Sequence, residues 1–331
     1  MDGPGRILVI PSIRESCLKD FLEAWGTDKG GWDAVILVED NPEKSFKAQV
    51  AYHFSWAEID KVLGKDAWII SRRDSAIRCF GFLIAWWLGA KYVLTLDDDC
   101  LPVNGHTPLF DRHMDFMYGH NKWVPSVPGI RTRGLPYENL GSLSSPPVIN
   151  IGLWEGVADF DGVQTLAHLS AGGRMHNFTP PLGNRIIPRG QYVPMCGMNL
   201  CFAREATPFL YFPLMGQDSP YARFDDIWAG VIAKRLCDHL GERVSVGEPF
   251  VKHVRASDPF QNLVKEAPGI AANETFWQQI DAVPLGEPSA SAALRELASG
   301  LQESKDAYIS RLGSALDIWD ALLCKQQPSS L

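Results

Sequence analysis

The segment that decides the fold is KYVLTLDDD, which occupies residues 91–99. Its apolar run predicts a strand that is buried on both faces, and three carboxylates follow directly at the carboxyl end of that strand. Three consecutive carboxylates repel one another unless a cation or basic side chains lie close to them. The segment therefore predicts a buried strand that places Asp97, Asp98 and Asp99 at one edge of a sheet.

Strand and helix patterns alternate in the first hundred residues. Strands are predicted over residues 6–11, 34–38, 67–70 and 91–96, and helices over residues 16–25, 56–63 and 74–88. Apolar strands that alternate with helices are typical of a mostly parallel sheet covered by helices on both faces. Ligands bind to such sheets at the carboxyl ends of the strands. The fold class is therefore predicted to be α/β.

The rest of the chain predicts an insertion, a few further elements and a helical end. Residues 104–191 are rich in Gly, Pro and Ser, and we interpret them as an active-site insertion. Helices are predicted over 108–118, 159–168 and 225–240, and strands over 192–202 and 245–254. The Ala-, Leu- and Ser-rich sequence after Pro288 predicts amphipathic helices. We therefore predict one catalytic domain over residues 1–285 and a helical C-terminal extension over residues 286–331.

The charge balance and the cysteines limit the classes of function. The chain has 331 residues, with 31 Lys and Arg against 39 Asp and Glu, which gives a net charge of −8. This balance argues against a protein that binds nucleic acid through bulk positive charge, so an anionic ligand must be held by a metal ion or by a few placed arginines. The seven cysteines are scattered without a C-x-x-C motif, and neither a signal peptide nor a membrane span is predicted. We therefore expect a cytoplasmic protein with reduced thiols.

The acidic triplet is a candidate metal site. In an extended segment the side chains of Asp97 and Asp99 point to the same side, so both could bind one divalent cation. Mg²⁺ and Mn²⁺ prefer oxygen ligands and are commonly bound by one or two carboxylates together with substrate phosphates. His253 becomes a third ligand if the strand predicted over 245–254 ends beside the triplet. A solvated acidic turn is the alternative interpretation.

A second acidic pair, Asp225 and Asp226, opens the helix predicted over 225–240. Carboxylates at a helix N-terminus are favoured by capping and by the helix dipole, so a structural role is one alternative. Two in succession exceed what a cap requires, and we expect one of them to face a substrate. Arginines near the triplet could hold a diphosphate, and the candidates are Arg14, Arg72, Arg73, Arg78, Arg131, Arg133, Arg185 and Arg189.

Six segments of the chain carry a resemblance to a known family. They are IPSIRE (10–15), RDSAIRCFGF (73–82), TLDDDC (95–100), PMCGMNLCF (194–202), RFDDIWAG (223–230) and ASDPFQNLVKE (256–266). Together they resemble the reversibly glycosylated polypeptides, the UDP-arabinopyranose mutase family of plants and some bacteria. The resemblance runs in order from about residue 6 to residue 280, whereas the Ala/Leu/Ser-rich tail looks like an extra segment.

The resemblance implies a GT-A glycosyltransferase fold that binds a UDP-sugar. It also implies a divalent cation, Mn²⁺ or Mg²⁺, held at Asp97 and Asp99. The residues of this chain that match nucleotide-sugar contacts of similar enzymes are Pro11, Ser12, Arg14, Asp40, Asp74, Arg78, Asp98 and Asn199.

The segment RGLPY (133–137) resembles the site at which family members glycosylate themselves reversibly on an arginine. Arg133 is therefore a predicted catalytic residue, together with Asp225 and Asp226. Plant members have a second arginine seven residues further on, where this chain has Leu140. Three functions stay open: a mutase that interconverts the pyranose and furanose forms of a UDP-sugar, a glycosyltransferase that uses an external acceptor, and a UDP-sugar-binding scaffold. A sugar acceptor and a second copy of the chain also stay open as partners.

Overall fold

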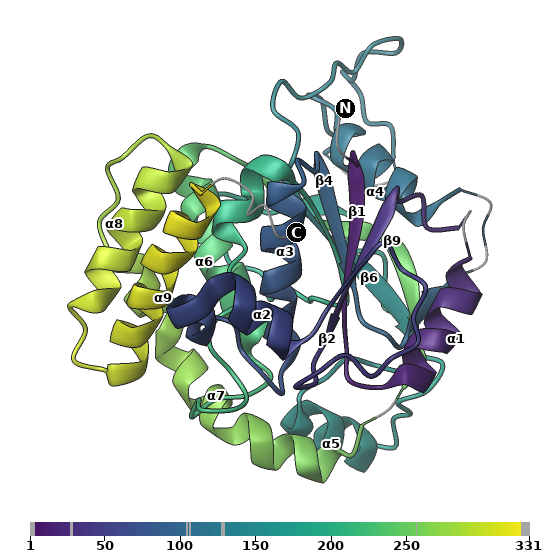
Figure 1. Cartoon of the computed structure of the whole chain (residues 1–331). Coiled ribbons are helices and arrows are strands. Elements are labelled where there is room, and N and C mark those ends of the chain that lie inside the picture. Colours follow the sequence, from purple (N-terminus) through teal and green to yellow (C-terminus); the bar gives the residue numbers. More distant parts are fainter. Residues whose placement is uncertain are drawn as a thin grey trace.

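A computed structural model describes residues 4–26, 29–103, 105, 107–126, 130–255 and 257–325. It shows one twisted sheet with helices on both faces (Figure 1). The strands are β1 (Arg6–Ser12), β2 (Ala34–Glu39), β3 (Tyr52–Phe54), β4 (Tyr92–Leu96), β5 (Cys100–Pro102), β6 (Ile149–Gly156), β7 (Arg185–Ile186), β8 (Asn199–Ala203) and β9 (Val244–His253). The α-helices are α1 (Glu15–Trp25), α2 (Trp56–Leu63), α3 (Arg78–Trp87), α4 (Leu109–Tyr118), α5 (Gly162–Ser170), α6 (Asp225–Leu240), α7 (Pro259–Asp281), α8 (Ala290–Gln302) and α9 (Ala307–Leu323). The 3-10 helices are η1 (Gly64–Ile69), η2 (Ser75–Ile77) and η3 (Arg204–Phe209).

The sheet has the strand order β3-β2-β1-β4-β8-β6-β9-β5, and β7 pairs with β9. β1 is parallel to β2 and to β4, and β6 is parallel to β9. β8 is antiparallel to both of its neighbours, so β6 and β9 run in the same direction as β4. The long strands therefore begin at one edge, here called the amino edge, and end at the other, the carboxyl edge. The predicted α/β class with a mostly parallel sheet is confirmed.

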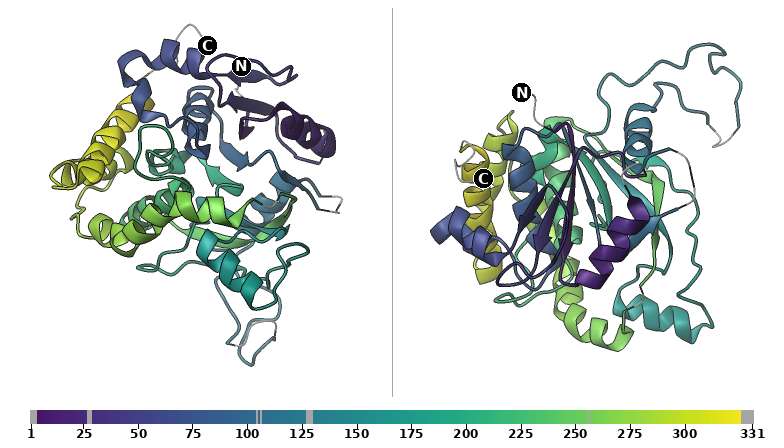
Figure 2. Two further views of the ribbon diagram at one scale, coloured as in Figure 1. Left: turned by 90° about the horizontal axis from the view of Figure 1, so that it is seen from below. Right: turned by 45° about the vertical axis from the view of Figure 1, so that its right-hand side comes forward.

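The alternating side chains of β1 show how the sequence builds two core layers. Ile7 and Val9 pack into the layer beneath α3 and α6, and Leu8 and Ile10 pack into the layer beneath α1 and α4. Figures 1 and 2 show these helices on the two sides of the sheet. A Cβ at Gly81 would lie 2.4 Å from Val9 Cγ1, so α3 can approach β1 this closely only with a glycine there.

Several predicted elements differ from the structure. Residues 67–69 form the end of η1 and Ile70 is its C-cap residue, so this segment is not a strand; a short buried apolar run does not distinguish a strand from a helical turn. The strand beside β2 is instead Tyr52–Phe54. The helix predicted over 74–88 divides into η2 and α3, and α1 begins at Glu15 with Arg14 as its N-cap residue instead of Ser16. α7 was not predicted, since it contains Pro268 and its apolar residues lack a clear helical period.

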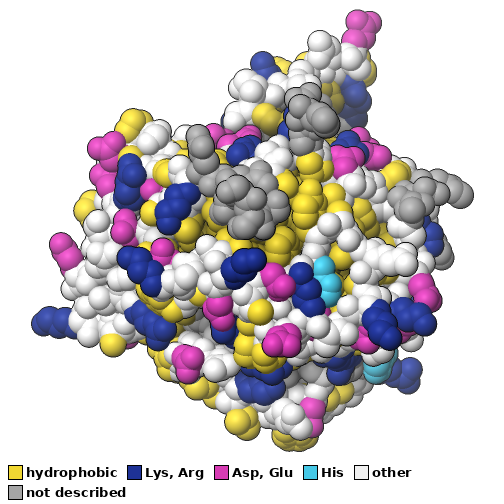
Figure 3. Space-filling model, viewed as in Figure 1, with side chains coloured by type: hydrophobic (Ala, Val, Ile, Leu, Met, Phe, Trp, Pro, Cys, Tyr) yellow, Lys and Arg dark blue, Asp and Glu magenta, His cyan; other side chains and the backbone are white. Residues whose placement is uncertain are grey.

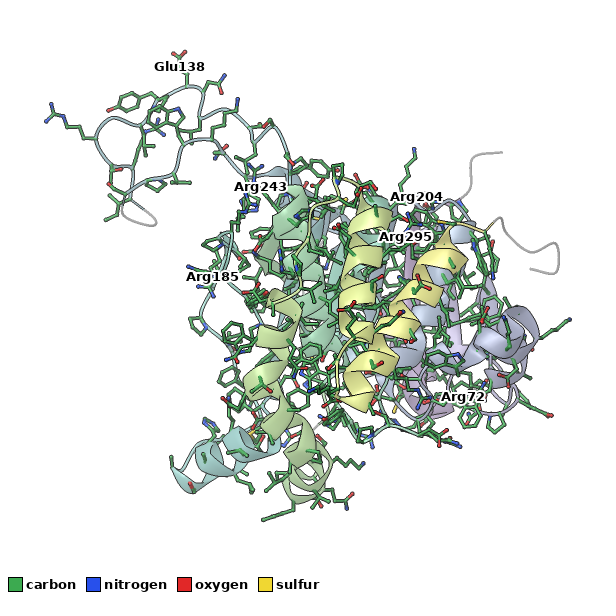
Figure 4. The ribbon with its side chains drawn as sticks, turned by 90° about the vertical axis from the view of Figure 1, so that its left-hand side faces the viewer. Arg72, Glu138, Arg185, Arg204, Arg243 and Arg295 are labelled. Carbon is green, nitrogen blue, oxygen red and sulfur yellow. The ribbon has the colours of Figure 1, made fainter. Side chains whose placement is uncertain are left out.

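Residues 104–191 are not a single insertion at the active site. They include α4, which packs on the sheet, and β6, an interior strand of the sheet that pairs with both β8 and β9. The described residues of 119–147 form an arm that projects from the body (Figures 2 and 4). Tyr118 Oη contacts Tyr92 Oη before the arm, and Val148 N donates to Arg243 O after it, at 2.9 Å. Since Tyr92 and Arg243 lie at the starts of β4 and β9, the arm leaves from the amino edge.

The predicted C-terminal extension shares the main hydrophobic core. α8 and α9 pack together as a hairpin whose Leu297 and Trp319 are fully buried. The hairpin covers α3 and η3, and the indole Nε1 of Trp86 donates to Leu323 O at 2.8 Å. Tyr308 Oη likewise donates to Leu214 O at 2.9 Å. The hairpin is therefore integrated with residues 1–285 through buried contacts.

The surface charges, the cysteines and the lengths of the helices add three further observations. Figure 3 shows Lys and Arg interspersed with Asp and Glu over the face of Figure 1. All seven cysteines are free thiols. Among the helices of the described residues, none is both long and apolar enough to cross a membrane.

Candidate functional site

The carboxyl edge brings the acidic triplet beside a buried arginine. Arg78 lies in the first turn of α3 and is 1 % exposed. Its guanidinium donates to Thr95 Oγ1 at 2.9 Å, to Gly197 O at 2.5 Å and to a carboxylate oxygen of Asp97. Burial alone would lower the pKa of Arg78, but the charges of Asp97 and Asp225 raise it above its ordinary value. Arg78 therefore stays positively charged and holds the Asp97 carboxylate in place.

Asp98 joins the ends of β1 and β4. It is 6 % exposed, and its carboxylate accepts from Ser12 Oγ at 2.6 Å and from an Arg14 Nη at 3.2 Å. Burial raises the pKa of Asp98, while the hydrogen bond from Ser12 and the charge of Arg14 act in the opposite direction. The structure thus brings together three predicted contacts, Ser12, Arg14 and Asp98, from positions 86 residues apart in the chain.

Asp99 faces His253 across the β5–β9 pair. Their register places Cys100 opposite His253, and Asp99 Oδ1 lies 3.9 Å from His253 Nε2. His253 Nδ1 lies 3.0 Å from Val157 O, an atom that can only accept, so Nδ1 donates to it and Nε2 is the ring nitrogen that faces Asp99. Burial, and then the charge of Asp97, raises the pKa of Asp99 to about 6. An imidazole oriented in this way by a backbone carbonyl is a common arrangement for a metal ligand.

These side chains fit a divalent cation as an incomplete set. Among the described residues, no three His, Cys, Asp or Glu side chains are arranged to hold a metal ion between them. Asp99 and His253 supply two ligands, and Asp97 is already bound to Arg78 through one oxygen. Mg²⁺ and Mn²⁺ are commonly held by one or two carboxylates with the remaining positions filled by water and substrate phosphates. The donor set therefore suits a cation whose coordination a phosphate ligand completes.

A second group of carboxylates, Asp74, Asp225 and Asp226, lies on the other side of Arg78. Ser75 Oγ donates to Asp225 at 2.6 Å, and the backbone N of Gly197 donates to Asp226 at 2.9 Å. Burial, and then the charge of Asp225, raises the pKa of Asp74 to about 8. Burial also raises the pKa values of Asp225 and Asp226. Asp74 therefore retains its proton at neutral pH, and the raised pKa values of all three carboxylates distinguish them from exposed helix-capping carboxylates.

Asp40 lies beside an aromatic side chain at the end of β2. It is 5 % exposed and accepts from Trp56 Nε1 at 2.8 Å and from the backbone N of Arg73 at 3.1 Å. Burial raises the pKa of Asp40. The guanidinium carbons of Arg72 and Arg73 lie 5.1 and 5.0 Å from the centre of the Trp56 ring. This corner, with the buried Pro11 in the adjoining β1, offers polar and aromatic groups suited to a nucleobase.

Two predicted nucleotide contacts, Asn199 and Arg78, are enclosed in the structure. Asn199 is fully buried, and its amide N donates to Leu153 O and Pro249 O, both at 2.8 Å. Its amide oxygen contacts His113 Nε2 at 2.9 Å, so its hydrogen-bonding groups are used inside the core. Arg78 is equally enclosed, and its guanidinium is bonded to Asp97.

The structure does not bring Arg133 to this site. Arg133 is exposed on the arm, which leaves from the amino edge, whereas Asp97 lies at the carboxyl edge. Arg131 lies on the same arm, where its guanidinium packs 4.7 Å from the Tyr137 ring centre. Figure 4 shows Arg243 at the base of the arm and Glu138 at its far end. A sequence motif indicates chemistry, but it carries no information about which edge of the sheet a loop leaves.

Sequence reasoning missed several groups at the carboxyl edge. Asp159 follows β6 and accepts from Cys196 Sγ at 3.3 Å. Arg223 forms an ion pair with Glu266 on α7, with 2.6 Å between Nε and Oε1. Two cavities lie away from these groups: one of about 330 Å³ is lined by residues of α7, α8 and α9, and one of about 100 Å³ by residues around α1, β5 and α4.

Comparison with known proteins gives a match over nearly the whole chain. The model of the family described as reversibly glycosylated polypeptide matches residues 6–327, so the match includes the C-terminal hairpin. A probable UDP-arabinopyranose mutase 1 of Solanum tuberosum is 32 % identical over 345 residues, which cover 94 % of this chain and 88 % of the relative. UDP-arabinopyranose mutase 1 of Arabidopsis thaliana is 33 % identical, and the match covers 94 % of this chain and 90 % of the relative.

Solved structures give weaker matches. Glucosyl-3-phosphoglycerate synthase from Mycobacterium tuberculosis, in complex with Mn²⁺, UDP and its product, has a TM-score of 0.40 and 16 % identity, covering 83 % of this chain and 80 % of that chain. The mannosyltransferase PcManGT from Pyrobaculum calidifontis, in complex with GDP-Man and Mn²⁺, has a TM-score of 0.38 and 13 % identity, covering 97 % and 85 %. At these values the likeness is too slight to carry an inference about the site.

Proposed function

Because this chain belongs to the reversibly glycosylated polypeptide family, we propose that it is a UDP-sugar mutase, which interconverts the pyranose and furanose forms of a UDP-pentose. The observation that carries this proposal is the identity of 32–33 % to relatives named UDP-arabinopyranose mutase over 94 % of the chain. UDP-arabinose is therefore the first substrate to test. The site geometry supports the proposal because base-binding, phosphate-binding and proton-holding groups adjoin one another along the carboxyl edge.

Two parts of the site would bind different parts of the nucleotide. Asp40 and Trp56 are placed to receive the uracil base at the end of β2. Asp99 and His253 would hold the Mn²⁺ or Mg²⁺, with Asp97 beside them. A bound cation would supply Lewis acidity, stabilising the negative charge that UDP gains as the bond between sugar C1 and phosphate oxygen breaks. Arg14, which contacts Asp98 and lies 4.0 Å from Asp99, orients both carboxylates.

The group of Asp74, Asp225 and Asp226 is suited to the sugar. Opening and reclosing a pyranose ring removes a proton from one hydroxyl and returns a proton to another oxygen. A carboxyl group that exchanges its proton near neutral pH is an efficient acid and base for such a step. Asp74, with its pKa of about 8, has this property, and Asp225 is held in position by Ser75.

A glycosyltransferase is the second candidate function. Two observations favour it: Leu140 occupies the position of the second arginine, and Arg133 lies on the arm at the amino edge, away from the triplet. An external acceptor would then take the sugar directly at the carboxyl edge. A UDP-sugar-binding scaffold would use the same groups without turnover.

Incubation of the purified protein with UDP-arabinopyranose and Mn²⁺ separates these functions. Chromatography of the nucleotides and intact-mass analysis of the protein are the two readouts. A furanose nucleotide supports the mutase. Free UDP that forms only after an acceptor is added supports the transferase, and binding without any new nucleotide supports the scaffold.

For Arg133 we propose glycosylation by a second molecule of the same protein. Its position at the opposite edge of the sheet from Asp97 and Asp99 supports transfer between molecules. Two differently tagged variants test this: Asp99→Asn keeps the acceptor, and Arg133→Lys keeps the donor site. The mass of the Asp99→Asn chain should increase by one sugar only when the two are mixed with UDP-sugar. An unchanged mass in the mixture, beside a modified wild-type chain, would contradict the proposal, and Arg131→Lys serves as the control on the same arm.

We further infer that the protein works in a reducing compartment such as the cytoplasm. All seven thiols are free, and four of them, including Cys79 and Cys201, are buried where oxidation would disturb the core. Thiol titration of the protein purified without reductant should recover seven thiols after denaturation.

A further inference from the structure

Arg223 lies beside the group of Asp74, Asp225 and Asp226 and has an unusual backbone conformation. Its φ angle is +64°, a left-handed value that non-glycine residues rarely adopt. Such residues persist where the surrounding structure holds them, and they are frequent in functional sites. Arg223 is followed directly by the N-cap residue of α6, and its backbone N lies 3.5 Å from Asp74 Oδ2. The strained residue is therefore built into the edge of the site.

The side chain of Arg223 is anchored by one end only. Its Nε donates to Glu266 Oε1 at 2.6 Å, and Glu266 is a buried carboxylate with a side chain 4 % exposed. The other oxygen of Glu266 accepts from the backbone N of Gly162, at 2.6 Å, at the start of α5. Glu266 is thus fixed on both oxygens. Within the described residues the Nη groups of Arg223 have no hydrogen-bond partner, and the side chain remains 41 % exposed.

The surroundings of Arg223 are acidic and belong to the site. Burial would lower the pKa of Arg223, but the hydrogen bond with Glu266 and the charges of Glu266, Asp159 and Asp226 raise it above the ordinary value. Asp159 follows β6, whose last residue pairs with His253. Arg223 therefore lies beside the group of Asp74, Asp225 and Asp226 and is exposed. Arg78, in contrast, is buried, and its guanidinium is hydrogen-bonded inside the protein.

We propose that Arg223, held at Nε by Glu266, presents its two Nη groups to the diphosphate of the UDP-sugar. The inference rests on the proposed function, since it names a further contact in the same site. A guanidinium fixed at one side and open at its end matches two phosphate oxygens at once, a geometry that lysine cannot reproduce. Arg223 is then a substrate-binding residue, and Glu266 is a positioning residue that acts through it.

Calorimetric titration with UDP and with uridine, both in EDTA, tests this contact without a contribution from the cation. Arg223→Gln should weaken UDP binding by about tenfold or more, since hydrogen bonds to charged groups are the stronger kind, and should change uridine binding by less than about twofold. Arg223→Lys should weaken UDP binding to a smaller extent. Glu266→Gln should weaken UDP binding while uridine binding is kept. The matched control is Arg295→Gln, because Arg295 also pairs, at 3.3 Å, with a buried carboxylate, Asp320, on the C-terminal hairpin (Figure 4).

The results separate the contact from the proposed function. Unchanged UDP binding in Arg223→Gln, or equal losses for UDP and uridine, would overturn the contact while leaving a UDP-binding wild type and the proposed function intact. A wild type that binds neither UDP nor a UDP-sugar, even with Mn²⁺, would overturn both. Where Arg223→Gln does not fold, as judged by its thermal unfolding against Arg295→Gln, the Arg223→Lys variant decides by the same comparison of UDP with uridine.

Discussion

Replacing Asp74 with Asn should stabilise the protein at pH 8 far more than at pH 5. Asp74 is the N-cap residue of η2, and its Oδ1 accepts from the backbone N of Ala76 at 3.1 Å, a hydrogen bond that Asn can also make. The substitution therefore removes the titrating carboxyl group and leaves this hydrogen bond in place. Burial, and then the charge of Asp225, raises the pKa of Asp74 to about 8 from 3.8.

The sign of the effect follows from proton linkage. Between these two pKa values the folded protein holds a proton at Asp74 that the unfolded chain has released, so the free energy of unfolding falls as the pH rises. The slope is at most about 1.4 kcal/mol per pH unit, which sets an upper limit of about 4 kcal/mol between pH 5 and pH 8. Because Asp74 titrates together with Asp225 and Asp226, part of the pH dependence belongs to these two carboxyl groups and stays in the variant. We therefore expect roughly half of this limit, about 2 kcal/mol.

Urea unfolding of the wild type and of Asp74→Asn at pH 5, 6, 7 and 8 measures the effect. The difference in unfolding free energy between the two proteins should grow by about 2 kcal/mol over this range, in favour of the variant. Asp306→Asn is the matched control, because Asp306 caps α9 in the same way but is exposed. If the difference in unfolding free energy between the two proteins stays constant from pH 5 to pH 8, the raised pKa of Asp74 is refuted.

Three further predictions test other parts of the structure. Arg78→Met should lower the unfolding free energy by about 3 kcal/mol, because it removes the buried partner of Asp97, and a loss under 1 kcal/mol in urea unfolding would disagree with that role. Burial lowers the pKa of His113 to about 3, so its ring should keep the neutral NMR shifts from pH 5 to pH 8; a midpoint near 6.5 would contradict the buried network with Asn199. Trp319→Ala should cost about 3–5 kcal/mol, and a chain ending at residue 285 should lose cooperative unfolding, whereas a stable truncated chain would make the hairpin a separate appendage.

The parts of the fold that could be predicted are those whose signal is local. β1 and β4 are apolar runs that end in polar residues, and α6 begins at the acidic pair and ends before Gly241 as predicted. β6 could not be recognised because its segment, INIGLWEG, contains Asn, Gly and Glu. Tertiary contacts explain these residues: Asn150 bonds to His113 at 2.8 Å, and a Cβ at Gly152 would lie 2.1 Å from the Asn199 amide N. Such contacts join residues far apart in the chain.

In the candidate site too, local signals could be predicted and tertiary contacts could not. The acidic triplet could be predicted from its position after a strand, but its three members could not be told apart. The structure gives each a different partner: Arg78 for Asp97, Ser12 and Arg14 for Asp98, and His253 for Asp99. These partners depend on strand order and register, which no local pattern contains.

The edge from which the arm leaves depends on topology as well. The motif around Arg133 indicates a chemistry without a location, and only the pairing of β6 with β8 and β9 places the arm at the amino edge. The pair of Arg223 and Glu266 was equally inaccessible, because 43 residues separate its members.

The central claim is that Asp99 and His253 bind a divalent cation that in turn binds the diphosphate of UDP. Calorimetric titration of UDP, with Mn²⁺ and with EDTA, measures this most directly in the wild type, Asp99→Asn and the control Asp306→Asn. The wild type and Asp306→Asn should bind UDP at least about tenfold more tightly with Mn²⁺ than with EDTA, and Asp99→Asn should lose that difference. Equal affinity in Mn²⁺ and EDTA for the wild type, or a full Mn²⁺ effect in Asp99→Asn, would contradict the claim.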